Sequence, residues 1–562
     1  MQLNWQYDKP RTPHALIAQR IVDAEDTAYS TPILDDLPSR IRVLVNNLYQ
    51  AKRTEPQVGA RREANLYLLD VKALTPVLKN ASFLDDDELK ARAVLMAHRF
   101  KQWGYYQSLA YLDQLDIAPP KAKTEQSLLA RLRCPKWWQR KFIRTQDRLE
   151  ESLAIRLGFV RKTFQVYCST ALLDRLQQRH KRSMQVLQQY EAISDQGVVC
   201  SMSDILKNSI GNPRLRRIEL MVRMRGFEDY AKSQGHVAMF YTITCPSKYH
   251  RYSGQSLNPN YQNYSPKDAQ DYLVKLWSLI RAQFSLAKLK PYGFRIAEPH
   301  HDGTPHWHIL LFMPQDQVTK VTSLLQTYAL REDGDEKGAA KHRFEAVEIK
   351  DEKGSATGYV AKYVSKNVDG FGFDLDEESD LKGNEAAERV RAWASVWGIR
   401  QFQQIGGAPV GVWRELRRVQ DQQENELLEA ARKAADEGKW ADYLHAQGGA
   451  TVPRNDQPLR VYTVGLYDKN TSAPVLNSYG EFTEKVDGIA VAGKPTLETR
   501  IQAWTIVKKG DVPLAVGARQ NLRKVPMCRM TAAELTALVD ALNDGMAAEE
   551  TAFPSSTLES CK

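Results

Sequence analysis

EPHHDGTPHWHILLFM, residues 298–313, contains four of the eleven histidines in this 562-residue chain and runs directly into an apolar stretch. The apolar and aromatic character of its second half predicts a buried β-strand. Successive side chains of a strand point to opposite faces of the sheet, so His306 and His308 project together while Trp307 and Ile309 point the other way. The stretch therefore predicts a strand that presents two imidazoles on one face.

Two imidazoles on one strand face make half of a metal site, although an isolated His-x-His pair is more often two surface histidines. The preceding segment favours a metal site over a pair of surface histidines, because Glu298 ends GFRIAE, a second expected strand. A carboxylate beside two imidazoles suits a hard or borderline divalent ion such as Mg²⁺ or Mn²⁺. We therefore predict His306, His308 and Glu298 as metal ligands, with His300 and His301 as alternatives for the third position.

The loop between the two strands decides whether the carboxylate can reach the imidazoles. If the loop holds an odd number of residues, for example 301–305, Glu298 lies opposite His308 and His300 lies opposite His306, all on one face. A two-residue turn would place the carboxylate on the other face. The prolines that flank the loop disfavour such a turn because each removes a donor from the ladder.

A second motif, GYVAKYVSKNV at residues 358–368, has the spacing of an amphipathic helix. Tyr359, Lys362, Tyr363 and Lys366 fall within a sector of about 100°, and the valines fill the opposite side. Because the valines already supply an apolar face, the tyrosines are not needed for ordinary packing. Two phenols beside two ammonium groups suit attack on phosphate, since a nearby cation favours the phenolate. The lysines can also hold the DNA backbone.

A metal site combined with tyrosine nucleophiles defines a transesterification. The ion polarises a phosphodiester oxygen, the tyrosine oxygen attacks phosphorus, and the products are a covalent phosphotyrosine and a free 3′-hydroxyl. One ester replaces another, so the break can be resealed without ATP, and the second tyrosine permits a second transfer. Tyr359 is the preferred first nucleophile because the positive end of the helix dipole would favour its phenolate.

The positive charge of the chain is concentrated in one block. The formal net charge is +10, and residues 131–183 contain 14 Lys or Arg against four acidic residues. Within this block, CPKWWQRKFIRTQDR at 134–148 places aromatic residues among cations, as surfaces that bind single-stranded nucleic acid do. Arg140, Lys141 and Arg144 are therefore predicted to bind DNA. The alternative is a solvated basic helix whose tryptophans face the core.

Helical spacing dominates the first 200 residues, and strand-like segments alternate with helical ones after them. We expect a helical N-terminal region with the basic block at 1–200, a catalytic domain at 201–375, a helical extension at 376–450 and a small β-rich region with a disordered tail at 451–562. The catalytic domain should be α+β and built on an antiparallel sheet. Its expected elements are strands at 236–244, 293–298, 306–313 and 344–350, and helices at 266–289, near 317–329 and from about 356.

Several classes of protein are excluded by what the sequence lacks. The six cysteines are scattered without a CxxC pair or regular spacing, so neither a disulfide framework nor a thiolate zinc site is suggested. No run approaches 18 apolar residues, and the N-terminal segment has no apolar core typical of a signal peptide, so we expect a soluble cytoplasmic protein with no membrane partner. The nearest match to a phosphate-binding loop is GIAVAGKPT at 488–496, where Pro495 replaces the required Ser or Thr. An ATPase is therefore not predicted.

In combination, these motifs resemble the HUH endonuclease superfamily, and more closely the replication gene A proteins of tailed phages. The resemblance is carried by EPHHDGTPHWH (298–308), GYVAKYVSKN (358–367), RRIELMVRMRGFEDYA (216–231) and WGIRQFQQIGGAPVGVWRELRR (397–418). It covers about residues 130–420. It implies that His306 and His308 are metal ligands and that Tyr359 and Tyr363 are the nucleophiles.

The resemblance also implies a function. This is site- and strand-specific nicking and joining of DNA at a replication origin through a covalent 5′-phosphotyrosine, which starts rolling-circle replication of a phage or prophage genome in the cytoplasm of a bacterial host. The expected substrates are single-stranded and supercoiled origin DNA, which a host helicase is expected to unwind because the chain has no ATPase motif. The alternatives within the superfamily are a relaxase, whose tyrosines usually precede the histidine motif, and a single-tyrosine transposase, which is much shorter. A non-catalytic DNA-binding regulator is the alternative from another class, and the intact ligands and tyrosines argue against it.

Overall fold

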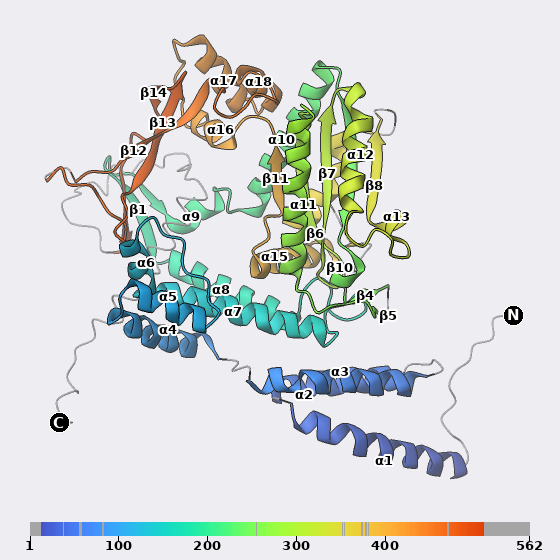
Figure 1. The fold of residues 1–562 in the computed structure, drawn as a ribbon. Coiled ribbons are helices and arrows are strands. Elements are labelled where there is room, and N and C mark those ends of the chain that lie inside the picture. The colour runs from blue at the N-terminus through green and yellow to red at the C-terminus, as the bar shows by residue number, and fades with distance from the viewer. Residues whose placement is uncertain are drawn as a thin grey trace, which may run out of the picture. The chain divides into compact units, whose positions relative to one another are not determined.

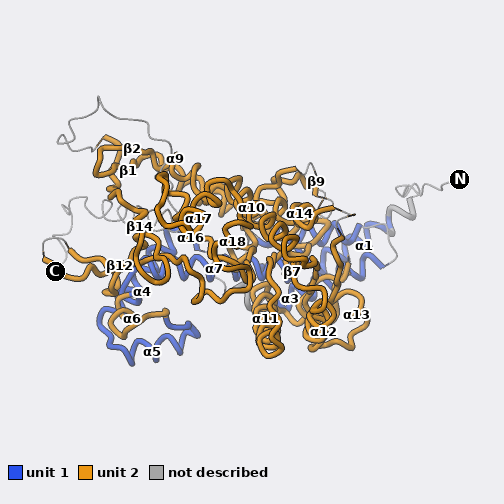
Figure 2. The backbone as a smooth tube through the Cα atoms, turned by 90° about the horizontal axis from the view of Figure 1, so that it is seen from above, with its two compact units in different colours: residues 1–119, 131–159 blue, residues 120–130, 160–562 orange. Residues whose placement is uncertain are grey.

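The computed structural model describes residues 13–510, apart from 38, 55–58, 81–83, 255, 351, 353, 373–374, 377–378, 380 and 469–470. The predicted disordered tail lies outside the described residues. The chain forms two compact units, which are residues 1–119 with 131–159 and residues 120–130 with 160–562 (Figure 2). The fold class is α+β, as predicted, with a helical N-terminal region followed by antiparallel sheets. The domain boundaries proposed above stay predictions.

The first unit is built from helices whose apolar residues recur at spacings of three and four. Inside the first turn of α4, Asp85 and Glu88 form a capping box, each side chain accepting a hydrogen bond from the other's backbone at 2.8 Å. The helices are α1 (Pro13–Asp35), α2 (Ser39–Arg53), α3 (Ala60–Asn80), α4 (Asp86–Lys101), α5 (Tyr105–Gln114) and α7 (Pro135–Arg156), with α6 (Glu125–Leu132) crossing the border between the units along the chain.

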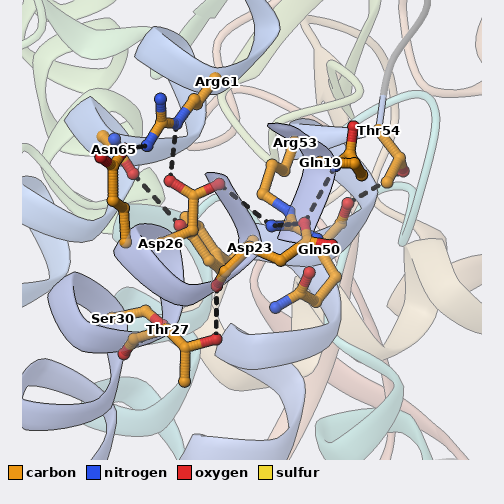
Figure 3. Close-up of polar contacts among 12 residues, drawn as sticks. Gln19, Asp23, Asp26, Thr27, Ser30, Gln50, Arg53, Thr54, Arg61 and Asn65 are labelled. Carbon is orange, nitrogen blue, oxygen red and sulfur yellow. Dashed lines mark hydrogen bonds and ion pairs between the residues drawn. The ribbon is translucent and has the colours of Figure 1, made fainter. Parts of the chain in front are cut away.

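A buried carboxylate connects the first three helices. Asp26 on α1 is 3% exposed and accepts hydrogen bonds from Arg53 on α2 at 3.0 Å and from Arg61 on α3 at 2.7 Å (Figure 3). Arg53 also contacts Asp23 at 3.0 Å. Removing one partner of such a buried pair leaves an uncompensated charge, so the cluster fixes α1 against α2 and α3.

The second unit is built around a five-stranded antiparallel sheet with the strand order β11-β6-β7-β3-β8 (Figure 1). Its strands are β3 (Val237–Thr244), β6 (Tyr292–Pro299), β7 (Pro305–Met313), β8 (Phe344–Ile349) and β11 (Phe402–Ile405). The four predicted strands are confirmed, and β11 adds an edge strand that the sequence pattern did not indicate. β6 and β7 are buried along their whole length. This burial follows from neighbouring strands on both sides and helices on both faces of the sheet.

Helices cover both faces of this sheet. On one face, the indole of Trp307 donates to Gln270 of α11 at 3.1 Å, and the hydroxyl of Tyr241 lies 2.9 Å from that of Thr322 on α12. On the other face, α10 and α14 pack on the strands and share a single apolar core with them. The four helices are α10 (Pro213–Ser233), α11 (Pro266–Leu286), α12 (Val318–Ala329) and α14 (Ala356–Val368).

The remaining elements of the second unit surround this core. No helix in the part of the chain that the structure describes is both long enough and apolar enough to cross a membrane. The helices are α8 (Thr170–Leu187), α9 (Met202–Lys207), α13 (Ala339–His342), α15 (Gly383–Trp397), α16 (Val410–Leu416), α17 (Glu426–Asp436) and α18 (Trp440–Ala446), with two 3-10 turns, η1 (Ser247–Tyr249) and η2 (Gln315–Gln317). The smaller sheets are β15-β1-β2, β12-β13-β14, β9-β10 and β4-β5, built from β1 (Tyr190–Ser194), β2 (Val199–Ser201), β4 (Tyr252–Ser253), β5 (Ser256–Leu257), β9 (Leu375–Asp376), β10 (Leu381–Lys382), β12 (Leu459–Gly465), β13 (Glu484–Val491), β14 (Lys494–Glu498) and β15 (Trp504–Lys508).

Candidate metal centre and tyrosine helix

Three donor side chains meet on the face of the central sheet that α14 covers. They are Glu298, at the end of β6, and His306 and His308, at the start of β7. The Nε2 atoms of the two histidines are 2.9 Å apart, and Oε2 of Glu298 lies 3.4 Å from Nε2 of His308 and 3.9 Å from Nε2 of His306. All three residues are buried, and their ligand atoms lie within 4.8 Å of one another. This grouping has the size and the donor types that one metal ion requires.

The register between β6 and β7 differs from the predicted one. Glu298 lies opposite His306, whereas the expected loop had placed it opposite His308. The connecting loop is 300–304, because the prolines at its two ends pair with each other as the last rung of the ladder. The predicted pairing of His300 with His306 is therefore wrong, and His300 lies in the loop. Both registers leave an odd number of residues in the loop, so the carboxylate still lies on the predicted face.

The surroundings of the two imidazoles suit metal binding. Burial lowers the pKa of His306 well below its ordinary value, and the charges of His300, His308 and Lys366 lower it further. A neutral imidazole is the form that coordinates a metal. Thr242 Oγ1 lies 3.2 Å from Nδ1 of His308, and this contact leaves Nε2 of that ring directed at the donor cluster. Two imidazoles and one carboxylate, held in this way, fit a divalent ion.

His300 and His301, the two alternative third ligands, stay outside the donor cluster. The ring of His300 packs on His306 with centroids 4.1 Å apart, and it makes an edge-to-face contact with His250 at a centroid distance of 5.0 Å. Of the residues that the structure describes, Glu298 is the one that groups with the two histidines. The geometry thus favours the carboxylate over either imidazole as the third ligand.

A buried asparagine links the carboxylate to the tyrosine helix. Asn367, in the last turn of α14, is 1% exposed and donates through Nδ2 to Glu298 Oε1. The same Nδ2 atom donates to the carbonyl oxygen of Tyr363 at 2.7 Å. Gln401, just before β11, donates to Oδ1 of Asn367 at 3.1 Å. The chain of contacts orients the Glu298 carboxylate and ties the end of α14 to the sheet.

Both tyrosines of α14 lie over Phe240 of β3, beside the donor cluster. The ring centroid of Tyr363 is 4.2 Å from that of His308 and 5.4 Å from that of Phe240. Tyr359 lies 4.8 Å from Phe240 and 6.4 Å from Tyr363, and it is 42% exposed. The valines of the helix are buried in the core, as predicted. Tyr363 therefore contacts a candidate ligand directly, and Tyr359 lies one turn away towards solvent.

A carboxylate closes the N-terminus of α14. Glu228 of α10 accepts hydrogen bonds from the backbone nitrogens of Ala356 at 3.3 Å and Thr357 at 3.0 Å, and from the Thr357 hydroxyl at 2.6 Å. Burial alone would raise the pKa of Glu228, but the hydrogen bonds from Thr357 and the charge of Lys232 hold it below its ordinary value. This negative charge offsets the positive end of the helix dipole, which weakens the argument for Tyr359 as first nucleophile.

The two lysines of α14 have different surroundings. Lys362 is exposed, and its ammonium nitrogen lies 5.2 Å from the ring centre of Tyr363. Lys366 is largely buried, with its nitrogen 3.7 Å from an oxygen of Asp376 and 5.1 Å from the ring centre of Tyr167. The Tyr167 hydroxyl donates to the same carboxylate at 2.7 Å. Lys362 is thus the better placed of the two to meet a phosphate from solvent.

Four residues that support this site were not indicated by the sequence. They are Thr242, Glu228, Asn367 and Gln401. Asn367 ends the quoted helix motif and lies one turn after Tyr363, so helical spacing alone could have placed it beside the ligands. The other three come from distant elements, and no spacing pattern connects them to the motifs.

The predicted DNA-binding residues of the basic block lie on α7. Arg140 and Arg144 are exposed there and Lys141 is half-buried. Trp138 is fully buried, stacks on Phe100 with ring centroids 5.3 Å apart, and donates its indole N–H to a backbone carbonyl at 2.7 Å. A base-stacking role for Trp138 is therefore wrong, and the alternative of a core tryptophan is correct. The block is also divided between the two compact units.

The fold and the site together define a class of protein in which an antiparallel sheet carries a Glu-His-His donor set and an adjoining helix carries two tyrosines. A model of the family described as bacteriophage replication gene A protein (GPA) matches residues 82–371, more than half of the chain. The chain belongs to this family.

The relatives with curated names are replication proteins of phages and prophages. The chain is 38% identical over 433 residues to a probable replication protein of Pseudoalteromonas phage PM2, which covers 72% of this chain and 66% of that protein. It is 42% identical over 397 residues to the replication gene A protein of Escherichia phage 186, with 68% and 56% covered. It is 35% identical over 402 residues to a probable replication endonuclease from a prophage-like region of Salmonella paratyphi A, with 68% and 49% covered. The match thus spans about half to two thirds of the length of these relatives, and no solved structure matches the chain.

Proposed function

We propose that this chain is a metal-dependent endonuclease and transesterase that nicks and rejoins one DNA strand at a replication origin. The reaction would start rolling-circle replication of a phage or prophage genome. The observation that carries the proposal is the meeting of the Glu298, His306 and His308 donor atoms within 4.8 Å, with the ring of Tyr363 packed 4.2 Å from His308. Membership of the replication gene A family and the endonuclease name of a relative support it.

The reaction follows from a phenol placed beside these donors. A divalent ion, Mg²⁺ or Mn²⁺, bound by the three ligands would act as a Lewis acid towards a phosphodiester oxygen. The tyrosine oxygen forms a bond to phosphorus, the bond from phosphorus to the 3′ oxygen breaks, and the 3′ oxygen takes up a proton. The products are a 5′-phosphotyrosine and a strand that ends in a 3′-hydroxyl. Lys362, whose nitrogen lies 5.2 Å from the ring centre of Tyr363, favours the phenolate form of the nucleophile.

The two tyrosines act in different steps of the reaction. We infer that Tyr363 makes the first attack because its ring contacts a ligand, and that Tyr359 accepts the strand in a second transfer. The two rings are 6.4 Å apart, so one scissile phosphate can meet either residue after a small movement. The reverse reaction, attack of a 3′-hydroxyl on the phosphotyrosine, joins the strand without ATP.

The partners follow from the same chemistry. Single-stranded and supercoiled origin DNA is the substrate, held through its phosphates by Lys362 and by Arg140, Lys141 and Arg144 of α7. Lys366 does not contact the phosphate directly in this proposal. Its ion pair with Asp376 holds the C-terminal half of α14 in position. A helicase of the bacterial host would supply the unwinding, and the reaction would take place in the host cytoplasm.

Mass spectrometry of the protein after reaction with a cleavable oligonucleotide tests the proposal. With Mn²⁺ present, a tryptic peptide that contains residues of α14 should carry a nucleotide adduct, and excess chelator should abolish it. Nicking of supercoiled plasmid that bears the origin should show the same metal dependence. An adduct on a residue outside α14, or nicking that persists in chelator, would overturn the assignment.

A further inference from the structure

A polar cavity lies next to the donor cluster in the second unit. It has a volume of about 390 Å³ and is lined by residues between β3 and α11, by the β6–β7 loop, and by Arg161 and Lys337. This volume lies in the range of small-ligand sites, about 300–1,000 Å³. His300 forms part of its wall and packs on the candidate ligand His306 with ring centroids 4.1 Å apart. One imidazole ring therefore separates the cavity from the donor cluster.

The walls of the cavity are held by buried polar groups. Asp302 is 4% exposed, and its carboxylate accepts hydrogen bonds from the backbone nitrogens of Arg251 at 2.9 Å and Thr304 at 3.0 Å. Asn258 is buried and donates to two backbone carbonyls, at 2.7 and 2.9 Å. These bonds connect the loops to each other, so the cavity exists before a ligand arrives.

Three cationic residues line the cavity, and two of them, Lys162 and Lys337, are exposed. The third is Arg161. Two carboxylates also line the cavity, and both already have partners. Asp302 lies 3.5 Å from Nδ1 of His250, and Glu336 lies 3.9 Å from a guanidinium nitrogen of Arg343, outside the cavity lining. Three cations beside two partnered carboxylates suit a ligand that carries a phosphate.

Two further lining residues suit an unpaired base. Asn260 is exposed, and its Nδ2 donates one hydrogen to Ser247 Oγ at 3.2 Å. The second N–H and Oδ1 of the same amide supply a donor and an acceptor, the combination that a base edge requires. Tyr252 lies beside Arg161, and its ring can serve as a stacking surface. The cavity therefore combines the two elements by which single-stranded DNA is recognised, a phosphate contact and a base contact.

The position of the cavity beside the donor cluster determines which nucleotide of the substrate lies next to it. Ring contacts connect His300 to His306 at 4.1 Å, His306 to His308 at 4.6 Å and His308 to Tyr363 at 4.2 Å. The cavity thus borders the donor cluster through His300 and His306, and the tyrosine borders it through His308. In phosphoryl transfer the attacking and leaving oxygens are roughly in line on opposite sides of phosphorus. The leaving 3′ oxygen, and the nucleotide that carries it, therefore point towards the cavity.

We propose that this cavity binds the nucleotide whose 3′ oxygen leaves, with its base against Asn260 and Tyr252 and its phosphate against Arg161 and the lysines. The inference rests on the proposed function and deepens it, because it makes the cavity a sequence-reading subsite on the 5′ side of the cut. The base of the last nucleotide of the released strand is then read by the protein.

A selection from random single strands tests the subsite. The wild-type protein is incubated with a pool of single-stranded DNA of random sequence and Mn²⁺, and both the protein-linked and the released strands are sequenced. With Asn260→Ala, discrimination at the last base of the released strand should fall about tenfold, while preferences on the protein-linked side persist. Lys320→Ala removes an exposed cation of α12 outside the cavity and should leave the whole profile unchanged.

A second variant separates the phosphate contact from the base contact. Arg161→Gln should raise the DNA concentration needed for half-maximal cleavage several-fold without changing which base is preferred. An Asn260→Ala profile identical to that of the wild type, or a loss of preference confined to the protein-linked side, would overturn the inference. Absence of any covalent product from the wild-type protein is a different failure, because it would overturn the proposed function itself.

Discussion

The donor cluster and the tyrosine helix lie next to each other but are held in position by different interactions. Glu298, His306 and His308 stand on adjacent strands, where the ladder and the alternation of side chains set their positions. The helix α14 is instead held at its two ends by hydrogen bonds to side chains of other elements. Glu228 of α10 accepts from its first turn, and Glu298 of β6 accepts from Asn367 in its last turn. Loss of a metal ligand should therefore remove chemistry and leave the geometry. Loss of Glu228 should shift the helix and leave the ligands, and loss of Asn367 should disturb both the helix and Glu298.

The largest effect is expected at the ligands. His308→Ala should lower the rate of nicking on the order of 10³-fold or more, because the ion loses one of three protein ligands and the Tyr363 ring loses its neighbour. Binding of single-stranded DNA, measured by fluorescence anisotropy in chelator, should change little. Nicking of plasmid by this variant without added metal would show that the donor cluster takes no part in the reaction.

The two single tyrosine variants should differ in how much of the first covalent adduct they form. Tyr363→Phe should lower formation of the first covalent adduct about 10²-fold or more, because its ring contacts His308, and Tyr359→Phe should retain most of it. The double variant should form no adduct. Single-turnover assays with a labelled oligonucleotide measure all three.

The opposite ranking of the two single variants would restore Tyr359 as the first nucleophile and show that the helix dipole outweighs proximity. An adduct in the double variant would place the nucleophile outside α14.

Asn367 connects the two regions, and its removal tests the comparison directly. Asn367→Ala should weaken the apparent affinity for Mn²⁺ about 10–100-fold, since partners that orient a ligand carry effects of this size. Gln401→Ala should do the same to a smaller extent, because it reaches Glu298 through Asn367. Titration of nicking rate against Mn²⁺ measures both, and a loss of maximal rate with unchanged metal dependence would make Asn367 a structural residue only.

The sequence predicted those parts of the fold that local periodicity and capping determine. The alternation in HWHILLFM placed both histidines on one face. The sequence SPKD at 265–268 has Ser as N-cap, Pro at the first helical position and Asp at the third, and it predicts where α11 begins. The structure shows the capping box of Ser265 and Asp268 there, with hydrogen bonds of 2.8 and 3.3 Å. The β6–β7 register was wrong by two residues because either odd loop satisfies the same alternation. Only the pairing of the two prolines, a tertiary outcome, distinguishes them.

The supporting residues could not be predicted for a different reason. Glu228 lies 128 residues before Ala356, whose backbone it caps, and Gln401 lies 34 residues after Asn367. Such contacts depend on how α10 and β11 pack, and packing leaves no periodic trace in the chain. The burial of Trp138 is similar, because a tryptophan among cations has the same local pattern whether it faces the core or the solvent.

The basic residues of α7 should affect binding without affecting chemistry. Reversing the charges of Arg140, Lys141 and Arg144 to Glu should flatten the dependence of log affinity on log salt by about two units, because each phosphate contact to a single strand contributes about 0.7. Arg92→Glu on α4, an exposed cation outside the block, controls for a single charge reversal elsewhere and should leave the slope unchanged. If the triple variant keeps the slope of the wild type, the block is a solvated surface and DNA is held elsewhere.

The smallest effect is expected at the N-terminal anchor of the helix, and it has a pH signature. The pKa of Glu228 is held below its ordinary value of 4.5, so its charge contributes stability that is present above this value and is lost as the pH falls through the lower folded pKa. Glu228→Gln should lower the free energy of unfolding by about 1–2 kcal/mol at pH 7, and the difference from wild type should shrink below pH 4.5.

Ser355→Ala is the control, because it removes the uncharged cap of the same helix. The Ser355 hydroxyl accepts a hydrogen bond from the backbone nitrogen of Gly358 at 2.9 Å. That variant should cost about 1 kcal/mol at every pH, because no charge is involved. Urea unfolding of both variants at pH 7 and pH 4 measures this, and a Glu228→Gln effect that does not shrink in acid would mean that the carboxylate anchors α14 by its shape and hydrogen bonds and not by its charge.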